Sequence, residues 1–432
     1  MMIKQLLKQI WVQRKQNGWI LAELLVVCVL MWYIVDFCFV IIHNKSIPIG
    51  SDINNTYVVT YGVLTEENSR YDPAESDSIQ MIQNLELFTH KIRQYDQVET
   101  ASLLNTAWGT LPYSGGFYGE LIQYDTIQTS AEIKFISSRD YFRIFRYTSA
   151  RDNSWERPAS IDLYQHNAVF ITRMIERKLF GQQSGIGKKI TIIGRNDNND
   201  KEYMIADILN DQKRFDYDLP AQAVFLPAEP LSVANMNSYA VCIRVKSGTP
   251  EKTFITGFVK EMTPALRIGN LYLEGIESMR ARKADIEYVF GTTNEVRTHV
   301  IIMTFFLLCI ALGVIGTFWF RIASRRNEIG VRMAMGGTRR KLQRQFILEA
   351  VLLLTIAIIP AVCISTFIMQ ADLMESFEKM PDPIYITGRR WLRFFITYGI
   401  TFLLLAVIVA ASAWIPARRA SKVHPVEALR EE

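Results

Sequence analysis

Four apolar stretches constrain this 432-residue chain more than any other feature. A helix needs about 20 mostly apolar residues to cross about 30 Å of hydrocarbon. One stretch lies near the N-terminus, and three follow a long, largely polar segment. They occupy residues 19–42, 300–320, 346–370 and 394–414. The pattern predicts an α-helical membrane domain of four transmembrane helices, with a large domain inserted between helices 1 and 2 and held outside the lipid.

The distribution of positive charge predicts the orientation in the membrane. Residues 321–345 hold eight Lys or Arg and one acid, Glu328, and the segments before Trp19 and after Trp414 are also basic. Short basic segments stay in the cytoplasm. We therefore expect residues 1–18, 321–345 and 415–432 to be cytoplasmic, and residues 43–278 and the loop 371–393 to be outside. Membrane topology explains this charge, so we expect the lipid bilayer as a partner and no nucleic acid.

The predicted outer domain contains one cysteine, Cys242. A disulfide within this domain of a single chain is therefore excluded, and the domain must be stabilised by an ordinary apolar core. The first apolar stretch is long, and no small-residue cleavage site follows it. We interpret it as a retained anchor rather than a signal peptide.

Residues 43–278 show both helical and strand patterns, which predicts an α+β fold. Residues 79–95 have helical periodicity, and residues 174–180 form a short helix that ends at Gly181. Five segments have the pattern of β-strands. They are residues 57–63, 189–193, 203–208, 221–226 and 239–245.

Residues 279–299 are charged but keep an apolar period, with Ile286, Val289, Phe290 and Val296. We predict a helix here that continues into the second span and forms a stalk between the domain and the membrane. A rigid helix can carry displacement between a domain and a membrane, which a flexible linker cannot.

Two acids, Glu23 and Asp36, fall within the first apolar stretch. Charged groups in a spanning helix are costly, and they often mark proton relays or contacts between helices. The simpler interpretation is that both lie near the membrane interfaces, with Glu23 close to Arg14 or Lys15. We favour the interface interpretation, and neither residue is given a role.

Catalytic, cofactor and metal motifs are not found in the sequence. The segment 181–189, GQQSGIGKK, has the wrong glycine spacing for a phosphate loop, and Lys189 stands where Ser or Thr would bind magnesium. The acidic run 196–200 lacks the glycine and glutamate of a calcium loop. The 432 residues contain no Walker motif. We therefore predict that the chain is not an enzyme and holds no cofactor of its own.

The most specific segment is RNEIGVRMAMGGTRRKLQRQFILEA, residues 326–350. The pattern predicts a short helix over 322–335, a stop at Gly336 and Gly337, and a new helix capped by Thr338 that runs into the third span. A loop that only fixed topology would not need the glycine pair or the apolar Ile329, Val331 and Met333. We call residues 321–345 the elbow.

At this segment the chain resembles the FtsX-like, or MacB-like, family of ABC transporter permeases. The positions that match the family motif are Glu328, Ile329, Gly330, Arg332, Ala334, Gly336, Gly337, Thr338 and Arg339. The ending PARRASKVHPVEALR, residues 416–430, also looks like the end of that family. Residues 137–227 resemble the MacB-like periplasmic core more loosely.

The resemblance implies a permease in the bacterial inner membrane that couples ATP hydrolysis, by a separate ATPase docked on the elbow, to movement of its periplasmic domain. ATP and magnesium would be bound by that ATPase. It further implies a homodimer or a paired sister permease, a periplasmic adaptor in some members, and an envelope substrate such as a peptide, drug or lipoprotein. The alternatives are an FtsX-like regulator of a cell-wall hydrolase, a membrane sensor and a membrane-bound hydrolase.

Overall fold

The structure is a computed structural model that describes residues 10, 12, 14–107, 109–164, 167–193, 200–323, 338–371 and 385–420. The chain divides into two compact units. The membrane unit comprises Met1–Ser46 and Glu295–Glu432, and the inserted domain comprises Ile47–Asn294. Each unit is described by itself.

Four helices are long and apolar enough to cross a membrane, as the sequence predicts. They are α2 (Arg14–Ser46), α9 (Thr292–Ala323), α11 (Arg339–Gln370) and α12 (Arg390–Ala420). We call the ends of these helices that lead to the basic segments the basic ends. The opposite ends, where α2 leaves for the inserted domain and α9 returns from it, are the domain ends.

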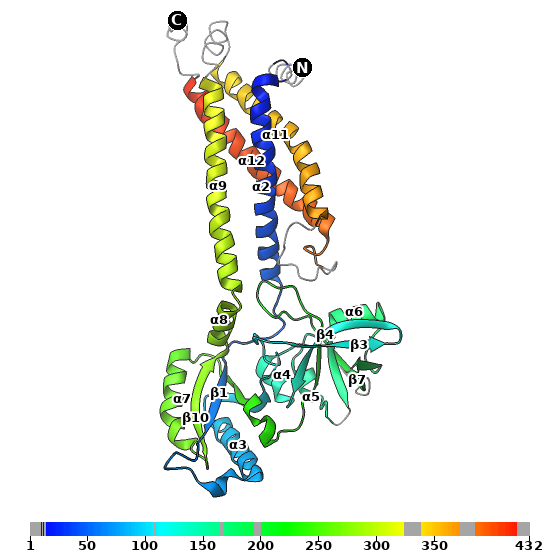
Figure 1. The fold of residues 1–432 in the computed structure, drawn as a ribbon, viewed down its shortest axis with the longest axis vertical. Helices are drawn as coiled ribbons and strands as arrows, with labels where there is room; N and C mark the ends of the chain where they lie inside the picture. The colour runs from blue at the N-terminus through cyan, green and yellow to red at the C-terminus, as the bar shows by residue number, and fades with distance from the viewer. Residues whose placement is uncertain are drawn as a thin grey trace. The chain divides into compact units, whose positions relative to one another are not determined.

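Helices α2, α11 and α12 lie side by side (Figure 1), and their apolar side chains form a shared core. Fully buried residues at its centre include Cys28, Met31, Leu353, Leu405 and Val409. Helix α9 lies along α2 and adds Ile310 and Val314 to the same core. Most of its other large apolar side chains are exposed, as expected of a helix that faces lipid.

A four-stranded antiparallel sheet forms one half of the inserted domain, in the order β10-β1-β9-β2. Its strands are β1 (Thr56–Val63), β2 (Val98–Asn105), β9 (Tyr239–Val245) and β10 (Leu271–Ser278). Side chains alternate between its faces. Val59, Val241 and Ile243 pack under helices α3 (Ser78–Arg93) and α7 (Glu251–Ala265). Val58 and Cys242 pack against α4 (Asp140–Phe145) on the opposite face.

A closed barrel in the order β3-β4-β8-β5-β7-β6 forms the other half of the inserted domain. The pairs β4–β8 and β5–β7 are parallel, and the other pairs are antiparallel. The strands are β3 (Tyr118–Tyr124), β4 (Ile127–Ile136), β5 (Ala168–Thr172), β6 (Lys189–Ile193), β7 (Lys201–Leu209) and β8 (Ala223–Pro227). Helix α6 (Arg173–Phe180) contributes Ile175 and Leu179 to the barrel core. Short helices α5 (Glu156–Ser160), η1 (Pro73–Ser76) and η2 (Val233–Ser238) lie in connections.

The α+β prediction is confirmed, and each helix and strand predicted within residues 43–278 has a counterpart in the structure. Gly181 ends α6 with a φ of 63°, and its N–H donates to Arg177 O. Closure of the strands into a barrel was not predicted, because it depends on pairing between distant segments.

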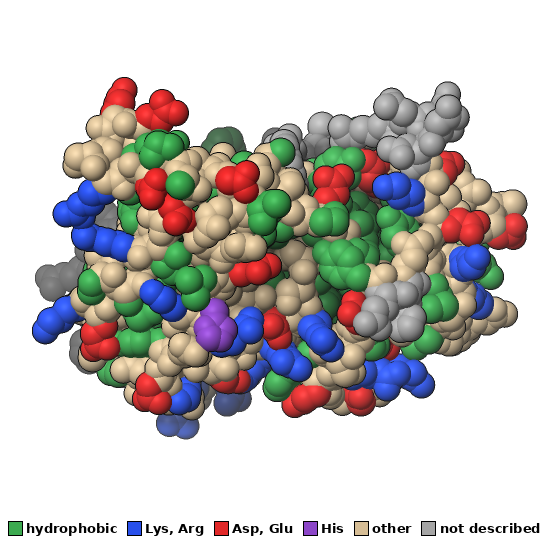
Figure 2. All heavy atoms as spheres, turned by 90° about the horizontal axis from the view of Figure 1, so that it is seen from below, with side chains coloured by type: hydrophobic (Ala, Val, Ile, Leu, Met, Phe, Trp, Pro, Cys, Tyr) green, Lys and Arg blue, Asp and Glu red, His purple; other side chains and the backbone are tan. Residues whose placement is uncertain are grey.

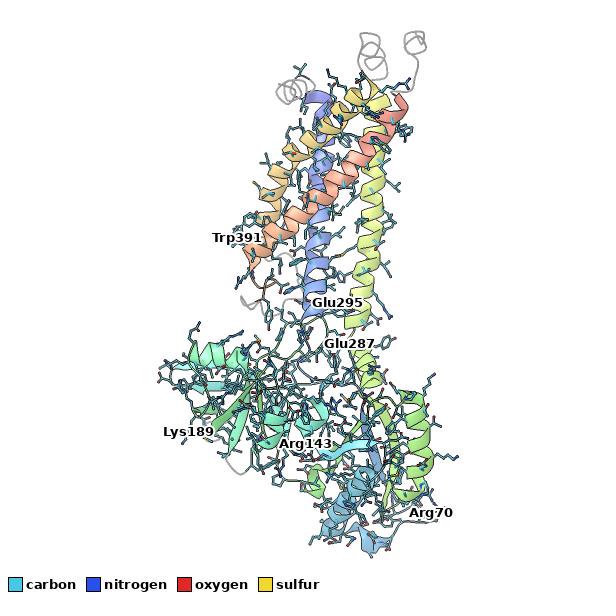
Figure 3. The ribbon with its side chains drawn as sticks, turned by 180° about the vertical axis from the view of Figure 1, so that it is seen from behind. Arg70, Arg143, Lys189, Glu287, Glu295 and Trp391 are labelled. Atoms are coloured by element: carbon cyan, nitrogen blue, oxygen red, sulfur yellow. The ribbon has the colours of Figure 1, made fainter. Side chains whose placement is uncertain are left out.

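The predicted continuous stalk helix over 279–299 is wrong. Helix α8 (Met279–Val289) ends before α9 begins at Thr292. Gly291 lies between them with a φ of 75°, which favours glycine and ends a helix. Figure 3 labels Glu287 on α8 and Glu295 on α9, on the two sides of this interruption. Periodicity identified both helices, and the left-handed glycine separates them.

Candidate functional site: the elbow, the membrane helices and the connections of the inserted domain

The predicted ATPase-coupling residues fall mostly outside the described part of the chain. Thr338 and Arg339 are described, and the remaining predicted positions are not. Those positions are Glu328, Ile329, Gly330, Arg332, Ala334, Gly336 and Gly337. The end of the family-like tail, from residue 421 onward, is also outside the described residues. The role of the elbow therefore stays a prediction.

Thr338 begins α11, as the sequence predicts. It is the N-cap residue with extended backbone (φ −77°, ψ 143°), and its carbonyl accepts from the N–H groups of Lys341 and Leu342. Its hydroxyl makes no capping hydrogen bond. Thr338 and Arg339 are both exposed. Residues 339–345, the end of the elbow segment, are thus the first residues of membrane helix α11.

Asp36 of α2 and Arg393 of α12 form an ion pair at the domain end of the membrane unit. Arg393 Nε lies 3.2 Å from Asp36 Oδ1, and the two side chains are 10% and 4% exposed. The hydroxyl of Thr397 lies 3.3 Å from the same oxygen. Burial removes water from both charges, so each depends on the other for stabilisation. The pair fixes α2 against α12.

Aromatic side chains surround this ion pair. Trp32 Nε1 donates to Thr397 Oγ1 at 3.1 Å, and its ring stacks on Tyr398 with centroids 5.7 Å apart. Tyr398 also shares a hydrogen bond with Ser365 of α11. Phe394 packs edge-on against Trp32. Helices α2, α11 and α12 are therefore joined at their domain ends by specific contacts as well as by apolar packing.

Asp36 and Glu23 both make contacts between helices, which the interface interpretation did not include, and their depth in the membrane stays a prediction. Asp36 binds Arg393, and the Glu23 carboxyl lies on Thr317 of α9. Asp36 lies near the end of α2 and Arg393 near the start of α12, so the two residues fall at similar positions along their helices. The sequence shows this similarity, but hydropathy does not show which helices are neighbours.

The first connection, residues 47–55, leads from α2 into the inserted domain and is fixed by Arg244. This arginine of β9 is 2% exposed. Its Nε donates to Ile144 O at 2.6 Å, Nη2 to Asp52 O at 2.6 Å, and Nη1 to Asn54 O at 3.1 Å. Nη1 also lies 3.2 Å from the Asp52 carboxylate. One buried guanidinium therefore binds the connection to the sheet and to α4.

Gly50 brings the first connection onto the loop between β7 and β8. Its φ is 90°, and a Cβ there would lie 2.6 Å from Asp211 O and 2.9 Å from the Gln212 backbone. Only glycine allows this close approach. The adjacent Ile49 carbonyl accepts from the Lys213 N–H at 3.0 Å. The connection thus contacts both halves of the inserted domain.

The second connection is α8, which is fixed to a loop of the barrel half. Lys283 Nζ lies 2.6 and 2.7 Å from the two carboxylate oxygens of Asp216. The Tyr113 hydroxyl donates to the same carboxylate at 2.9 Å. Burial acts to raise the pKa of Asp216, but the contacts with Lys283 and Tyr113 outweigh it and hold that pKa below its ordinary value. The carboxylate is thus kept ionised.

The two connections also bind each other. Arg280 of α8 donates to Asn54 Oδ1 at 2.6 Å. Next to this contact, β1 and β10 pair with Tyr57 opposite Ser278. The two connections are therefore adjacent, and they are bound to each other and to the core of the inserted domain.

The loop 109–117 supports Tyr113 and is fixed at its start by a buried lysine. Lys134 Nζ of β4 donates to Gly109 O at 2.8 Å. Burial lowers the pKa of Lys134 to about 8, partly opposed by the Glu132 carboxylate. Glu132 in turn pairs with Arg214.

The face of the domain in Figure 2 shows Lys and Arg interspersed with Asp and Glu, and apolar side chains line a hollow in it.

These features define a class of protein. The chain is a multi-pass membrane protein with a large α+β domain inserted between its first two membrane helices. Residues 300–425 match the family described as FtsX-like permease C-terminal. The carboxyl-terminal part of the chain is thus similar to the FtsX-like permeases, and the relatives that match a longer part of the chain are MacB-type export proteins.

Named relatives agree with this assignment. The chain is 25% identical over 307 residues to the macrolide export ATP-binding/permease protein MacB of Shewanella sp. (strain W3-18-1), covering 68% of this chain and 42% of that protein. It is 23% identical over 342 residues to the probable syringafactin export ATP-binding/permease protein SyfD of Pseudomonas syringae pv. tomato, covering 72% and 44%. The chain therefore spans less than half the length of these curated relatives.

A solved structure is also similar. The periplasmic region of MacB from Actinobacillus actinomycetemcomitans matches with 9% identity and a TM-score of 0.31. The match covers 55% of this chain and 94% of that one.

Proposed function

We propose that this chain is a membrane-spanning subunit of an ABC transporter, and that a separate ATPase docks on its elbow and drives movement of the inserted domain. The observation that carries the proposal is the pair of fixed connections. Arg244 and Lys283 join the chain segments next to α2 and α9 to the core of the domain. In this proposal, a displacement of α2 or α9 is passed on to the domain through these two segments.

The structural features support motion rather than flow through a pore. Helices α2, α11 and α12 share a packed apolar core, with Cys28, Leu353 and Leu405 fully buried. The 432 residues contain no Walker motif, and in this proposal a separate ATPase supplies the energy. The names of the relatives pair export with ATP binding. We propose an envelope substrate, a peptide, drug or lipoprotein, with the inserted domain in the periplasm and both termini in the cytoplasm.

Co-purification in mild detergent with nucleotide tests the ATPase partner. We expect a separate Walker-bearing protein to accompany the chain, and its hydrolysis to rise when the chain is present in lipid nanodiscs. Recovery of no ATPase, or nucleotide hydrolysis by the chain alone, contradicts the proposal.

Charge reversal in the elbow tests the docking site. Glu328→Lys should abolish stimulation of the ATPase while membrane insertion is unchanged. Glu86→Lys makes the same charge change at an exposed position of α3 and is the matched control, with stimulation retained. Equal stimulation by the two variants would reject the elbow as the docking site.

A further inference from the structure

A cavity of about 220 Å³ lies in the inserted domain where its two connections meet. Its walls come from the first connection and the start of β1, from the turn before α7, and from the junction of β10 with α8. A single water needs only about 10–15 Å³ of such space, so the cavity is large enough for a small organic molecule. The side chains that decide its chemistry are those of Tyr57, Glu251, Ser278 and Arg280.

Tyr57 brings a hydroxyl without a partner to this cavity. The residue is 3% exposed, and its ring packs against Phe254 with centroids 4.7 Å apart. Among the described residues, none forms a hydrogen bond with the Tyr57 hydroxyl. Burial raises the pKa of Tyr57, the Glu251 carboxylate adds to this effect, and Arg280 opposes it. Buried hydroxyls nearly always have a partner, so the acceptor for Tyr57 has to be a molecule inside the cavity.

Two opposite charges line the same cavity, and within the described chain they form no ion pair with each other. Glu251 is the first residue of α7, and its Oε1 accepts from the Ser278 hydroxyl at 2.6 Å. Its Oε2 accepts no hydrogen bond from any described residue. Arg280 Nη2 donates to Asn54 Oδ1 at 2.6 Å, and its other N–H groups meet no acceptor among those residues. Each charge can therefore take a further partner.

This combination of charges selects the kind of ligand. A carboxylate repels a simple anion, and a guanidinium repels a simple cation. A primary ammonium group has three donors and matches the unpaired oxygen of Glu251. A carboxylate or phosphate group matches the fork of donors on Arg280 and can accept from the Tyr57 hydroxyl. A molecule that carries both groups therefore satisfies all three side chains.

We propose that this cavity binds a small zwitterion, with its ammonium group on Glu251 and its carboxylate or phosphate group on Arg280 and Tyr57. An amino acid and the phosphoethanolamine headgroup of a lipid both have this chemistry. Tyr57 follows the first connection directly, and Arg280 belongs to α8. A bound molecule would therefore contact the segments of both connections at once. The inference goes beyond the proposed function and does not depend on a partner ATPase.

Titration calorimetry on the full chain tests the site. The probes are β-alanine and O-phosphoethanolamine, and the chain is held in nanodiscs of phosphatidylglycerol, which has no ammonium group. We expect at least one zwitterion to bind about tenfold more tightly than inorganic phosphate, acetate or ethylamine, because each of these lacks one charged hydrogen bond. Equally tight binding of the single charges, or no binding of either zwitterion, would overturn the proposal.

Two substitutions separate the roles of the wall residues. Glu251→Gln keeps the size of the side chain and should abolish the advantage of the zwitterions over phosphate and acetate. Tyr57→Phe removes only the hydroxyl and should weaken both zwitterions several-fold. Glu86→Gln, at an exposed position of α3, is the matched control and should bind as the wild type does. Wild-type binding by Glu251→Gln would refute the site.

A second titration identifies the source of the zwitterion. It repeats the measurement with phosphatidylethanolamine in the nanodiscs. If the lipid headgroup fills the cavity, O-phosphoethanolamine should bind several-fold more weakly, because the two compete. Unchanged binding identifies a soluble molecule as the ligand. Either result supports the site, since both require that the free zwitterion binds in the first titration.

Discussion

Lys283 of α8 lies within 2.7 Å of both carboxylate oxygens of Asp216, and this ion pair fixes the last helix of the inserted domain to a loop of its barrel half. The two side chains are 23% and 24% exposed. The strand that leads into α8 belongs to the four-stranded sheet. The pair therefore joins both halves of the domain at the point where the chain leaves for α9.

Removal of this ion pair should loosen α8. We expect Lys283→Met to reduce the protection of α8 amides from hydrogen exchange by the equivalent of about 1–3 kcal/mol, because Asp216 loses a charged partner while partly buried. Lys252→Met, at an exposed position of α7, is the matched control and should have no such effect. Equal protection in the two variants would show that the pair does not hold α8.

The same pair should depend on pH in a defined direction. The pKa of folded Asp216 lies below its ordinary value of about 3.9. The stability that it contributes is therefore fully present above that pH and is lost as the pH falls through the folded pKa. The stability difference between wild type and Asp216→Asn should shrink as the pH is lowered from about 5 to about 3. A constant difference would contradict the assignment.

Arg244 should not be replaceable even by lysine. Its guanidinium binds three carbonyls and the Asp52 carboxylate from a fully buried position. Lysine keeps the charge but not the planar arrangement of donors. We expect Arg244→Lys to lower the free energy of unfolding of the inserted domain by about 3 kcal/mol. Exchange should rise first in residues 50–56, and an undisturbed first connection would refute this role.

Alanine substitutions at Gly50 and Gly187 allow the cost of a steric clash to be measured separately from the cost of backbone strain. Both have positive φ, 90° and 79°, but only at Gly50 would a Cβ meet backbone atoms. Alanine at Gly187 should cost about 1 kcal/mol from conformation alone. Gly50→Ala should cost clearly more and should lower the melting temperature further. Equal melting temperatures would show that the first connection can shift away from the 211–212 loop.

Lys134 should make the domain more stable at alkaline pH. The ordinary pKa of lysine is about 10.4, and burial lowers that of Lys134 to about 8. Between these values the unfolded chain binds more protons than the folded one, so stability rises with pH. Relative to Lys134→Met, the wild type should gain up to about 3 kcal/mol between pH 8 and 10. A difference that does not change with pH would contradict the buried charge.

Asp36 and Arg393 should show strong coupling in a double-mutant cycle. Asp36→Asn or Arg393→Gln alone leaves one charge buried without its partner, so each should destabilise the membrane unit by about 2–4 kcal/mol. The double variant should lose less than the sum of the two. Fluorescence of Trp32, which packs on Phe394 and Tyr398, reports the unfolding in detergent. If the losses in unfolding free energy of the two single variants add up to that of the double variant, Asp36 and Arg393 have no interaction energy.

The elements that could be predicted from the sequence are those set by local patterns. Helix α3 was visible from its apolar period and α6 from its closing glycine, and Thr338 marks the start of α11. The interruption at Gly291 was missed because a glycine at a helix end adopts positive φ only when the following segment leaves the helical path. The pattern of apolar residues continues across it.

The sequence by itself determined the number and lengths of the membrane helices and the place of the inserted domain, because crossing hydrocarbon requires a continuous apolar run that can be read residue by residue. Only the tertiary structure decided that Asp36 pairs with Arg393, that Glu23 meets Thr317, and that β4 and β8 close a barrel. These contacts join residues far apart in the chain. Their choice depends on which surfaces pack together, and no local pattern encodes that.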